Sequence, residues 1–236
     1  MEDFLRKATN PGQYDSENFD WQQSGLTDSP IRRYFQYYLA PKLEISGKSL
    51  IDIGWGMGSM VGLLEEKGAR EIIGIDPSKN NIAVAQKNYP RQQFIVSTME
   101  NYLVERKFDV AVSIMVFEHI GDPQKMFTKI FSLLNGNGTF YLVTGDKGYN
   151  TTQRMGYEIE VQKVGEDIAL TKTKRSWETS YDIFRSVSFF IECGKKAGFR
   201  LKEHLPLIPD DETIKMIPKY KDFKEVPIAH LFIFEK

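Results

Sequence analysis

Two aspartates flank a glycine-rich turn, and each comes at or near the end of a short apolar run. Asp52 precedes Gly54, Gly56 and Gly58, and Asp76 ends the next apolar run. Glycines permit positive φ and leave room for a ligand close to the backbone. A carboxylate in the position of Asp76 can accept two hydrogen bonds from a ribose diol, and Asp52 can reach an ammonium group. These residue types predict a site for a nucleoside that carries a cationic amino-acid arm.

A dinucleotide is the alternative ligand for such a turn. Dinucleotide sites use G-x-G-x-x-G, in which the third glycine allows the helix to pack closely on the strand. Here that position is Ser59, the glycines run G-x-G-x-G, and the charge of Asp52 opposes a pyrophosphate. Both departures favour the nucleoside with an amino-acid arm over NAD. We expect the next helix to begin at about Gly58 and to offer free N–H groups near the ligand.

A second group of reactive side chains comes directly after a later apolar run. His119 is the best candidate base among the three histidines, with Glu118 able to tune or orient it, although the pair can also form a structural corner. His204 and His230 fall in the last two apolar runs and are expected to be packed or exposed. Glu118, His119 and Asp146 are a conceivable set of ligands for a divalent cation, but their spacing is unspecific, and we predict no metal site.

An alternation of short strands and helices is expected to position these residues. Apolar strands separated by helices are typical of βαβ units on a parallel sheet that is buried on both faces. The runs 201–207 and 228–235 lie close together without a helical crossover, which predicts an antiparallel final pair. Ligands of open α/β sheets bind at the carboxyl ends of the strands. The other expected strands are 49–53, 71–75, 93–96, 109–115 and 139–144, and the expected helices between them are 58–67, 79–88 and 123–134.

The alternation stops after residue 145. Residues 157–174 show two alternating strands around a Gly-Glu-Asp turn, which predicts a hairpin. We expect 145–185 to form a cap inserted into a domain that spans 45–236, with 1–44 as an N-terminal lid or helical segment. The hairpin edge can cover the site or pair with a second subunit, so both a monomer and a homodimer are open.

Composition narrows the function further. The 236 residues include 31 basic and 32 acidic ones, giving a formal net charge of −1, which argues against a dedicated nucleic-acid binder. The single cysteine, Cys193, excludes an intramolecular disulfide and a thiolate metal cluster. The N-terminus is unlike a signal peptide, and no stretch approaches the roughly 18 apolar residues of a membrane span. We therefore expect a cytoplasmic protein without a membrane partner.

Five segments in order carry a resemblance to a known family. LIDIGWGMG (50–58) resembles the first motif of the class I S-adenosylmethionine-dependent methyltransferases, and IIGIDPS (72–78) resembles their second-strand acidic motif. The Glu-His pair and the following GDP are most like the ubiquinone-biosynthesis and related small-molecule methyltransferases. The resemblance covers roughly residues 45–145. The other three segments, FIVSTMENY (94–102), KFDVAVSIMVFEHIGDPQKMF (107–127) and LLNGNGTFYLV (133–143), are similar to the adenine-flanking loop, the fourth strand and the fifth strand.

This resemblance implies a fold and a cofactor. The fold is a doubly wound α/β structure with a seven-stranded, mostly parallel sheet, an antiparallel last strand, and a lid or hairpin insertion after the fifth strand. The cofactor is S-adenosylmethionine, with S-adenosylhomocysteine as its product. The residues implied to bind it are Asp52, Gly54, Gly56, Gly58, Asp76, Pro77, Thr98, Met99, Glu100 and Ile114.

The implied roles divide along the cofactor. Asp52 and the first two glycines of the turn hold the methionine arm, and Asp76 holds the ribose hydroxyls. Met99 packs on adenine opposite Ile75 or Pro77, with Glu100 or its neighbours at the ring edge, and Ile114 closes the pocket. One departure is Thr98, which stands where the family often has aspartate, so that this contact with adenine is in doubt.

The implied activity is transfer of a methyl group to an oxygen or nitrogen of a small organic molecule. His119 and Glu118 are the candidate catalytic residues. The alternatives are methylation of a protein or peptide side chain, and a cofactor-binding domain without turnover. Nucleic-acid acceptors are not expected, because SIMVFEH lacks the Asn/Asp-Pro-Pro-aromatic motif and Cys193 is far from the strand ends. The aromatic residues expected to contact the acceptor are Tyr14, Trp21, Tyr149, Trp177 and Tyr181.

Trp55 is an unusual residue for a turn that a ligand must approach. Because the backbone on both sides faces the cofactor, the indole must point away from it. We expect it to turn under the loop, against Tyr34 or Tyr38 of the N-terminal segment or against the part that carries Trp21. The alternative is that it joins the aromatic wall of the acceptor site.

Overall fold

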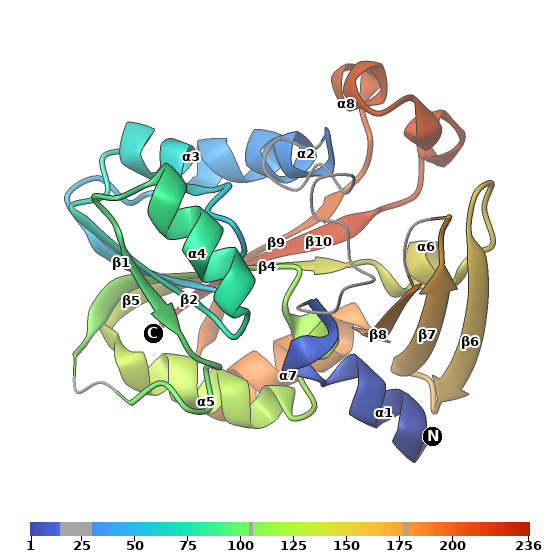
Figure 1. Cartoon of the computed structure of the whole chain (residues 1–236), viewed down its shortest axis with the longest axis horizontal. Coiled ribbons are helices and arrows are strands. Elements are labelled where there is room, and N and C mark those ends of the chain that lie inside the picture. The colour runs from blue at the N-terminus through green and yellow to red at the C-terminus, as the bar shows by residue number, and fades with distance from the viewer. Residues whose placement is uncertain (15–29, 104–105, 177–178) are drawn as a thin grey trace.

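Two β-sheets, with helices packed against them, form the core of the protein (Figure 1). The computed structural model describes residues 1–14, 30–103, 106–176 and 179–236. The larger sheet has seven strands in the order β3-β2-β1-β4-β5-β10-β9, of which β1 to β5 run parallel. Strand β10 is antiparallel to β5 and to β9. This confirms the expected mostly parallel sheet with an antiparallel last strand. The strands are β1 (Ser49–Ile53), β2 (Glu71–Asp76), β3 (Gln93–Val96), β4 (Phe108–Ile114), β5 (Leu134–Gly145), β9 (Arg200–Leu207) and β10 (Ala229–Glu235).

Helices cover both faces of the large sheet, and the alternation of side chains along each strand explains why. In β1, Leu50 packs into the cluster formed with α2, α3 and α4, whereas Ile51 and Ile53 pack into the cluster formed with α5 and α7. A strand buried on both sides is largely apolar, and in β1 the exceptions are Ser49 and Asp52, which are buried as well. The helices are α2 (Pro30–Leu39), α3 (Val61–Glu66), α4 (Lys79–Asn88), α5 (Pro123–Leu133), α7 (Val187–Ala197) and α8 (Asp211–Met216).

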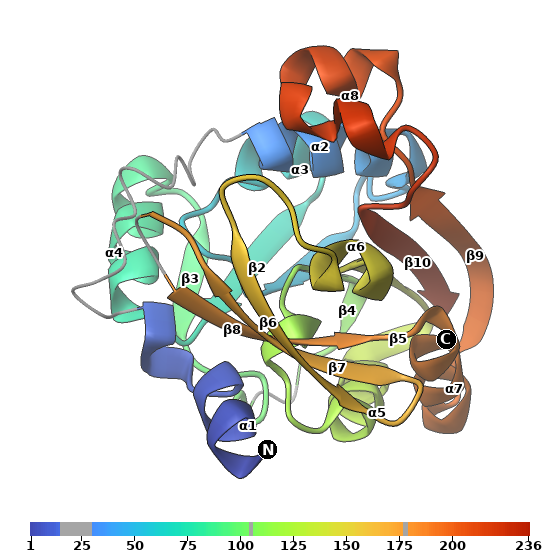
Figure 2. The same ribbon diagram turned by 90° about the vertical axis from the view of Figure 1, so that its right-hand side faces the viewer.

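The smaller sheet lies across the carboxyl ends of β4 and β5 (Figure 2). The predicted hairpin is present as β6 (Glu158–Val164) and β7 (Ile168–Lys174), but a third strand, β8 (Thr179–Arg185), pairs antiparallel with β7 and was not predicted. A short helix, α6 (Lys147–Thr151), connects β5 to this sheet. The N-terminal helix α1 (Glu2–Ala8), also not predicted, packs against β7 and β8 through an apolar cluster.

The helix after the glycine turn begins later than the sequence predicts. Gly54, Gly56 and Gly58 have φ of 74°, 58° and 86°, and α3 begins at Val61 rather than at about residue 58. Positive φ is incompatible with a right-handed helix, so the chain cannot become helical before it has passed the last of these glycines. The helix N-terminus therefore does not lie at Gly58.

Trp55 is only 3% exposed, but it packs in a place that the sequence did not predict. The indole lies on β2, where a Cβ built on Gly74 would stand 2.4 Å from the indole Cδ2. The centroid of the indole ring is 5.1 Å from the centroid of the Phe94 ring. Gly74 leaves the space that the indole fills. The expected partner Tyr34 belongs to the same hydrophobic cluster as Trp55, and Tyr38 packs against that cluster; both tyrosines donate their hydroxyls to backbone carbonyls at the end of β9.

Among the described residues, no helix is both long and apolar enough to cross a membrane.

Candidate active site

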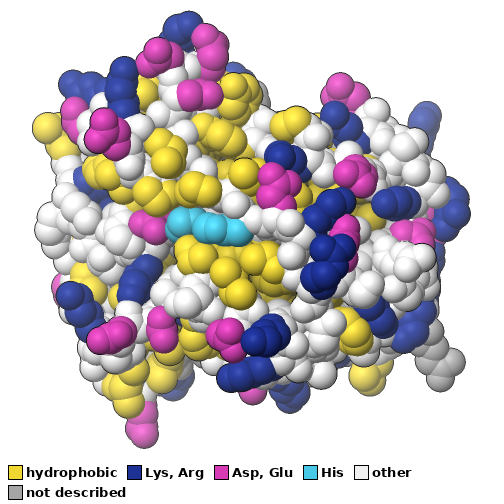
Figure 3. Space-filling model, turned by 180° about the vertical axis from the view of Figure 1, so that it is seen from behind, with side chains coloured by type: hydrophobic (Ala, Val, Ile, Leu, Met, Phe, Trp, Pro, Cys, Tyr) yellow, Lys and Arg dark blue, Asp and Glu magenta, His cyan; other side chains and the backbone are white. Residues whose placement is uncertain are grey.

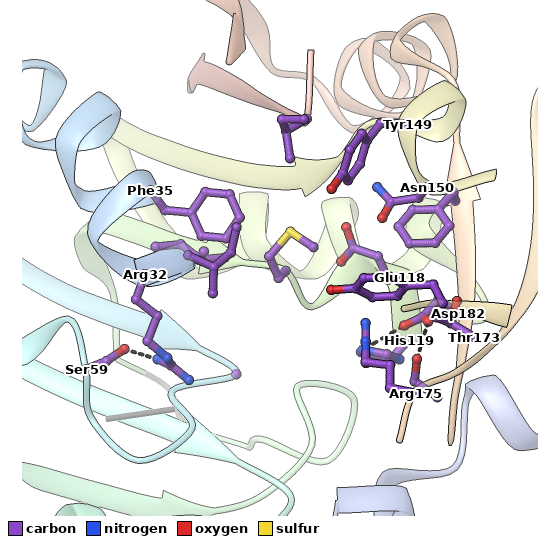
Figure 4. Close-up of a pocket in the computed structure, with 18 of the residues that line it drawn as sticks. Arg32, Phe35, Ser59, Glu118, His119, Tyr149, Asn150, Thr173, Arg175 and Asp182 are labelled. Atoms are coloured by element: carbon purple, nitrogen blue, oxygen red, sulfur yellow. Dashed lines mark hydrogen bonds and ion pairs between the residues drawn. The ribbon is translucent and has the colours of Figure 1, made fainter. Parts of the chain in front are cut away.

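Two cavities meet at the carboxyl ends of β1 and β4, where open α/β sheets bind their ligands. The first has a volume of about 420 Å³ and the second about 350 Å³. In Figure 4, Arg32 and Ser59 lie at one end of the first cavity, and His119, Arg175 and Asp182 lie toward the other. The residues that line both cavities are Arg32, Gly54, Ile114, Met115 and His119.

The second cavity brings together most of the residues expected to bind the cofactor. Asp52 faces the first cavity instead. Gly58 lines neither, because its neighbours are Tyr89 and Trp55: a Cβ at Gly58 would stand 2.9 Å from the Tyr89 ring. Glycine is therefore needed at 58 for packing. The expected residues in the second cavity are Gly54, Gly56, Asp76, Pro77, Thr98, Met99, Glu100 and Ile114.

Asp76 connects the glycine turn to the end of β2. Its Oδ2 accepts a hydrogen bond from the Gly56 amide at 2.9 Å. Its Oδ1 accepts from the Ser78 amide at 2.9 Å and from the Asn81 side chain at 3.2 Å. These bonds hold the carboxylate in a fixed orientation at the wall of the second cavity.

A buried carboxylate and a buried guanidinium face each other at the first cavity. Burial raises the pKa of Asp52 to about 8, although the Arg32 guanidinium opposes this shift. Burial likewise lowers the pKa of Arg32 to about 10, opposed by Asp52 and Asp76. Arg32 donates to the Ser59 hydroxyl, while its Nε has no partner among the described residues. A cation and a carboxyl side by side complement the carboxylate and ammonium of an amino-acid arm.

The sequence analysis missed Arg32. A signal was present, because Arg32 lies three and seven residues before Phe35 and Leu39, on the face of α2 that packs on the sheet. A charged residue on such a face needs a polar partner.

Glu118 fastens the short helix η3 (Phe117–His119) to the end of β5. It is 1% exposed, and its Oε1 accepts from the Thr144 hydroxyl at 2.7 Å and from the Gly145 amide at 2.6 Å. Burial raises its pKa, against the effect of these two bonds. Its other oxygen, Oε2, is buried and has no partner within the described part of the chain, and the residue lines the first cavity.

The hydrogen bonds of Glu118 described above go to Thr144 and Gly145, and its charge acts on His119 electrostatically. The structure also places Asp182 of β8 beside the imidazole, with Oδ1 3.8 Å from Nε2 (Figure 4). Asp182 in turn accepts a hydrogen bond from the Ser180 hydroxyl at 2.9 Å. Both residues face the cavity from β8, a strand that the sequence analysis did not predict.

The loop that carries His119 is bound by Arg185 and follows a residue with a strained backbone. Arg185 of β8 is buried and donates to the carbonyls of Phe117 at 2.7 Å and Ile120 at 2.6 Å. Just before the loop, Met115 has φ 57° and is the one non-glycine residue of positive φ in the described ranges. Such strain persists only where the surroundings enforce it, and it occurs preferentially at functional sites.

Asp146 does not join the Glu-His pair. It caps α6 by accepting from the Tyr149 amide at 2.6 Å, and its Oδ2 lies 2.9 Å from Nε2 of His230. The Nδ1 of His230 is in turn 3.1 Å from the Nε2 of His204. Figure 3 shows histidine side chains gathered on one face of the molecule. In the part of the chain that the structure describes, no group of three or more histidine, cysteine, aspartate or glutamate side chains could hold a metal ion.

The structure separates the residues expected to contact an acceptor. Tyr149 lines the first cavity. Tyr181 faces the opposite side of β8, where its ring lies 5.5 Å from that of Phe4 in α1. Because side chains alternate along a strand, the orientation of Ser180 and Asp182 toward the cavity turns Tyr181 away from it. Trp21 and Trp177 lie outside the described residues, as does the side chain of Tyr14.

Comparison with known proteins decides the family. A family model described as a methyltransferase domain matches residues 27–204. The chain belongs to the class I S-adenosylmethionine-dependent methyltransferases. The match confirms the resemblance of the motifs between residues 50 and 143.

Individual methyltransferases are similar to this chain at low identity. The mitochondrial ubiquinone biosynthesis O-methyltransferase of Dictyostelium discoideum is 24% identical in an alignment of 168 positions, and the match covers 58% of this chain and 52% of that protein. The ubiquinone biosynthesis O-methyltransferase of Rhodopseudomonas palustris is 29% identical over 111 residues, 45% of this chain and 44% of that one. The matched region thus spans about half the length of these curated methyltransferases.

The fold of this chain is similar to that of solved methyltransferase structures. The crystal structure of an S-adenosylmethionine-dependent methyltransferase from Mesorhizobium loti superposes with a TM-score of 0.71 at 18% identity, covering 88% of this chain and 100% of that one. This similarity establishes the methyltransferase fold.

Proposed function

We propose that this methyltransferase transfers the methyl group of S-adenosylmethionine to an oxygen or nitrogen atom of a small organic molecule. The observation that carries the proposal is the meeting of two cavities at His119, one lined by the expected cofactor residues and the other by polar and aromatic side chains. The first cavity, at about 420 Å³, has the size of a small-molecule site.

The residues present fit the cofactor. Asp76 is held with its carboxylate toward the second cavity, where ribose hydroxyls would bind it. Met99 and Pro77 supply apolar surface for adenine, and the departure at Thr98 leaves a hydroxyl at the ring edge. Arg32 and Asp52 would bind the carboxylate and the ammonium of the methionine arm. The unpartnered Nε of Arg32 supports this assignment, since a buried donor without an acceptor is costly.

The chain's own part in the reaction is alignment, exclusion of water and proton handling. Bound S-adenosylmethionine supplies an electrophilic methyl group on a sulfonium centre. His119 would take the proton of an acceptor hydroxyl or ammonium, because it lines both cavities. The Asp182 carboxylate, 3.8 Å from Nε2, would stabilise the positive charge that the imidazole gains when it takes the proton. Asp182 is thus a positioning residue.

Glu118 would contribute a second polar contact. Its Oε2 is buried beside the first cavity without a partner, so an acceptor O–H or N–H would satisfy it. Burial raises its pKa, and a carboxylate of higher pKa is a stronger proton acceptor.

The segment 145–185 would act as the cap of this site within a domain spanning 45–236, and 1–44 as an N-terminal segment closing it. Residues of α6, β7 and β8 line the first cavity, which supports the cap. A protein side chain would need an extended groove in place of this walled cavity.

Calorimetric titration with S-adenosylhomocysteine tests the cofactor half of the proposal. We expect binding to the native chain, loss of binding in Asp76→Ala, and unchanged binding in Asp211→Ala, which removes a carboxylate that pairs with Lys224 on the surface. Absence of binding to the native chain, or native affinity in Asp76→Ala, would overturn it.

A metabolite screen with a homocysteine-release assay tests the acceptor half. His119→Ala should slow release for the acceptor found while keeping the affinity for S-adenosylhomocysteine. If no acceptor is turned over, the chain binds the cofactor without the proposed chemistry. If the variant is as fast as the native enzyme, His119 is not the base.

A further inference from the structure

Within the proposed acceptor site, three cationic side chains converge on one tyrosine. Arg154 follows α6, Arg175 follows β7, and Lys219 belongs to the short helix η4 (Pro218–Phe223). The Arg154 and Arg175 guanidinium carbons lie 4.6 Å and 5.2 Å from the ring centroid of Tyr157, and the Lys219 Nζ lies 3.1 Å from its hydroxyl oxygen. All four residues line the first cavity. We propose that this cluster binds an oxyanion, a carboxylate or a phosphate, that the methyl acceptor carries.

Two of the three cations have no carboxylate partner in the described part of the chain. Neither Arg154 nor Lys219 forms an ion pair there, whereas several other lysines do. The acids that line the same cavity make other contacts: Asp52 faces Arg32, Asp182 lies beside His119, and Glu118 accepts from Thr144 and Gly145. The paired lysines around the cluster are Lys172 with Glu160, Lys174 with Glu158, Lys215 with Glu212 and Lys224 with Asp211.

The pKa of the Tyr157 hydroxyl is also lowered by the positive charge of the cluster. Burial acts to raise the pKa of its hydroxyl, but Lys219, Arg175 and Arg154 outweigh burial and lower it. Groups that stabilise a phenolate stabilise another oxyanion in the same place.

Arg154 is fixed in a geometry suited to an anion. Its Nη1 donates to the carbonyls of Tyr149 at 2.9 Å and Thr152 at 3.1 Å, and its guanidinium carbon lies 4.3 Å from the centroid of the Tyr149 ring. Its Nε is buried and has no partner in the described part of the chain. A guanidinium held in this way loses little freedom on binding, and oxyanions bind such groups with two parallel hydrogen bonds.

The cluster and the Glu-His pair line the same cavity, and together they specify a type of acceptor. Tyr149, Tyr157 and Tyr220 also line it and offer flat apolar surface. The acceptor is then a small, flat molecule with its hydroxyl or amine toward Glu118 and His119 and its acidic group toward the cluster. This assignment rests on the proposed function of the cavity.

The test compares matched ligands on the chain saturated with S-adenosylhomocysteine. Benzoate and phenyl phosphate carry the two candidate oxyanions, and benzyl alcohol is the neutral control. We expect one of the anionic probes to bind at least about tenfold more tightly than benzyl alcohol, the ratio expected of a charge-assisted hydrogen bond of 1.5–3 kcal/mol. The tighter of the two identifies the carboxylate or the phosphate.

Variants assign the preference to the cluster. Lys219→Gln and Arg154→Gln should abolish it, and Lys221→Gln, an exposed lysine of the same short helix, should retain it. Lys219 is itself exposed, so its variant keeps the fold if Arg154→Gln does not. Equal binding of the neutral and anionic probes, no detectable binding of either anion, or a preference that survives in Lys219→Gln would overturn the proposal.

The outcomes remain separate from those of the proposed function. If S-adenosylhomocysteine does not bind, the probes are titrated against the chain alone, and an anion preference that depends on Lys219 still supports the cluster. If the cofactor product binds and no anion preference exists, the cluster proposal fails while the methyltransferase proposal stands.

Discussion

The carboxylate of Asp182 lies 3.8 Å from the imidazole Nε2 of His119, and this contact joins the smaller sheet to the loop that follows β4. The two residues are 63 positions apart in the sequence, and the third strand of the smaller sheet is what brings them together. A histidine that follows a strand of the large sheet thus contacts a carboxylate of the smaller sheet.

Turnover should depend on this contact. We expect His119→Ala to lower kcat by about 10²–10⁴-fold, the range of general base catalysis, and Asp182→Asn to lower it by a smaller factor because the base remains. KM for the acceptor and affinity for S-adenosylhomocysteine should change little in Asp182→Asn. Asp222→Asn, an exposed aspartate in η4, is the matched control. An unchanged kcat in Asp182→Asn would remove it from the mechanism.

Alanine at Gly54 should be much more harmful than alanine at another glycine of the same φ. Gly47 has φ 70° with nothing within 4 Å of a built Cβ, so Gly47→Ala should cost about 1–2 kcal/mol for the left-handed backbone alone. Gly54 has φ 74°, and its Cβ would stand 2.2 Å from Val116 Cγ2. Overpacking should add about 1–3 kcal/mol, measured by urea unfolding. Equal losses would show that the turn can move away from β4.

Trp55 and Gly74 should be energetically coupled. Trp55→Ala should cost about 3–5 kcal/mol as a large core truncation, and Gly74→Ala should be destabilising because its Cβ would stand 2.4 Å from the indole. In the double variant the new methyl group occupies space that the indole has left. Its loss of stability should therefore be smaller than the sum of the two single losses by about 0.5–3 kcal/mol. Gly136→Ala, which meets nothing within 4 Å, should add fully to Trp55→Ala. Additivity at Gly74 as well would contradict the packing described.

Stability should depend on pH through Asp52. Its pKa is raised from 3.8 to about 8 in the fold, so between these values the folded chain holds a proton that the unfolded chain has released. Stability from this group therefore falls as pH rises from about 4 to 8. Asp52→Asn removes that dependence. At the upper end of this pH range, the variant should be more stable than the native chain by at least about 1.4 kcal/mol, the equivalent of one pKa unit.

The same variant should bind S-adenosylhomocysteine less well, since the amide cannot pair with the ammonium as a carboxylate does. Urea unfolding at a series of pH values checks the first effect and calorimetry the second. Parallel pH curves for the two proteins would mean that Asp52 is already ionised in the fold.

The parts of the fold that sequence predicted are those with strong local signals. The strand with Leu50 and Ile51 and the strand that follows it are mostly apolar because both faces are buried, and the first ends at the glycine turn and the second at Asp76. The start of α3 was misplaced because the apolar spacing around Met60 and Val61 carries no information about φ at Gly58. Strand β8 was missed because Ser180 and Asp182 are polar where a sheet face meets a cavity.

The candidate site also contains residues that the sequence indicated and residues that it did not. The residues expected to bind the cofactor follow one another at the ends of consecutive strands, and most of them line one cavity. Lys219 and Arg154 gave no signal, since a lysine or arginine at the surface and one that lines a cavity look alike in sequence, and only the three-dimensional fold brings them to Tyr157. The packing of Trp55 depended on the empty space above Gly74, which no spacing rule reveals.

The segment between β5 and α7 contributes to one cavity and not to the other. The second cavity is built mostly from the ends of β1, β2 and β4 and the loop after β3, whereas the first takes Tyr149, Arg175 and Asp182 from that segment. Under the proposed assignment, replacement of this segment would change much of the acceptor cavity and leave the lining of the second cavity in place. Substrate choice would then change within a single gene while the methyl donor stays the same.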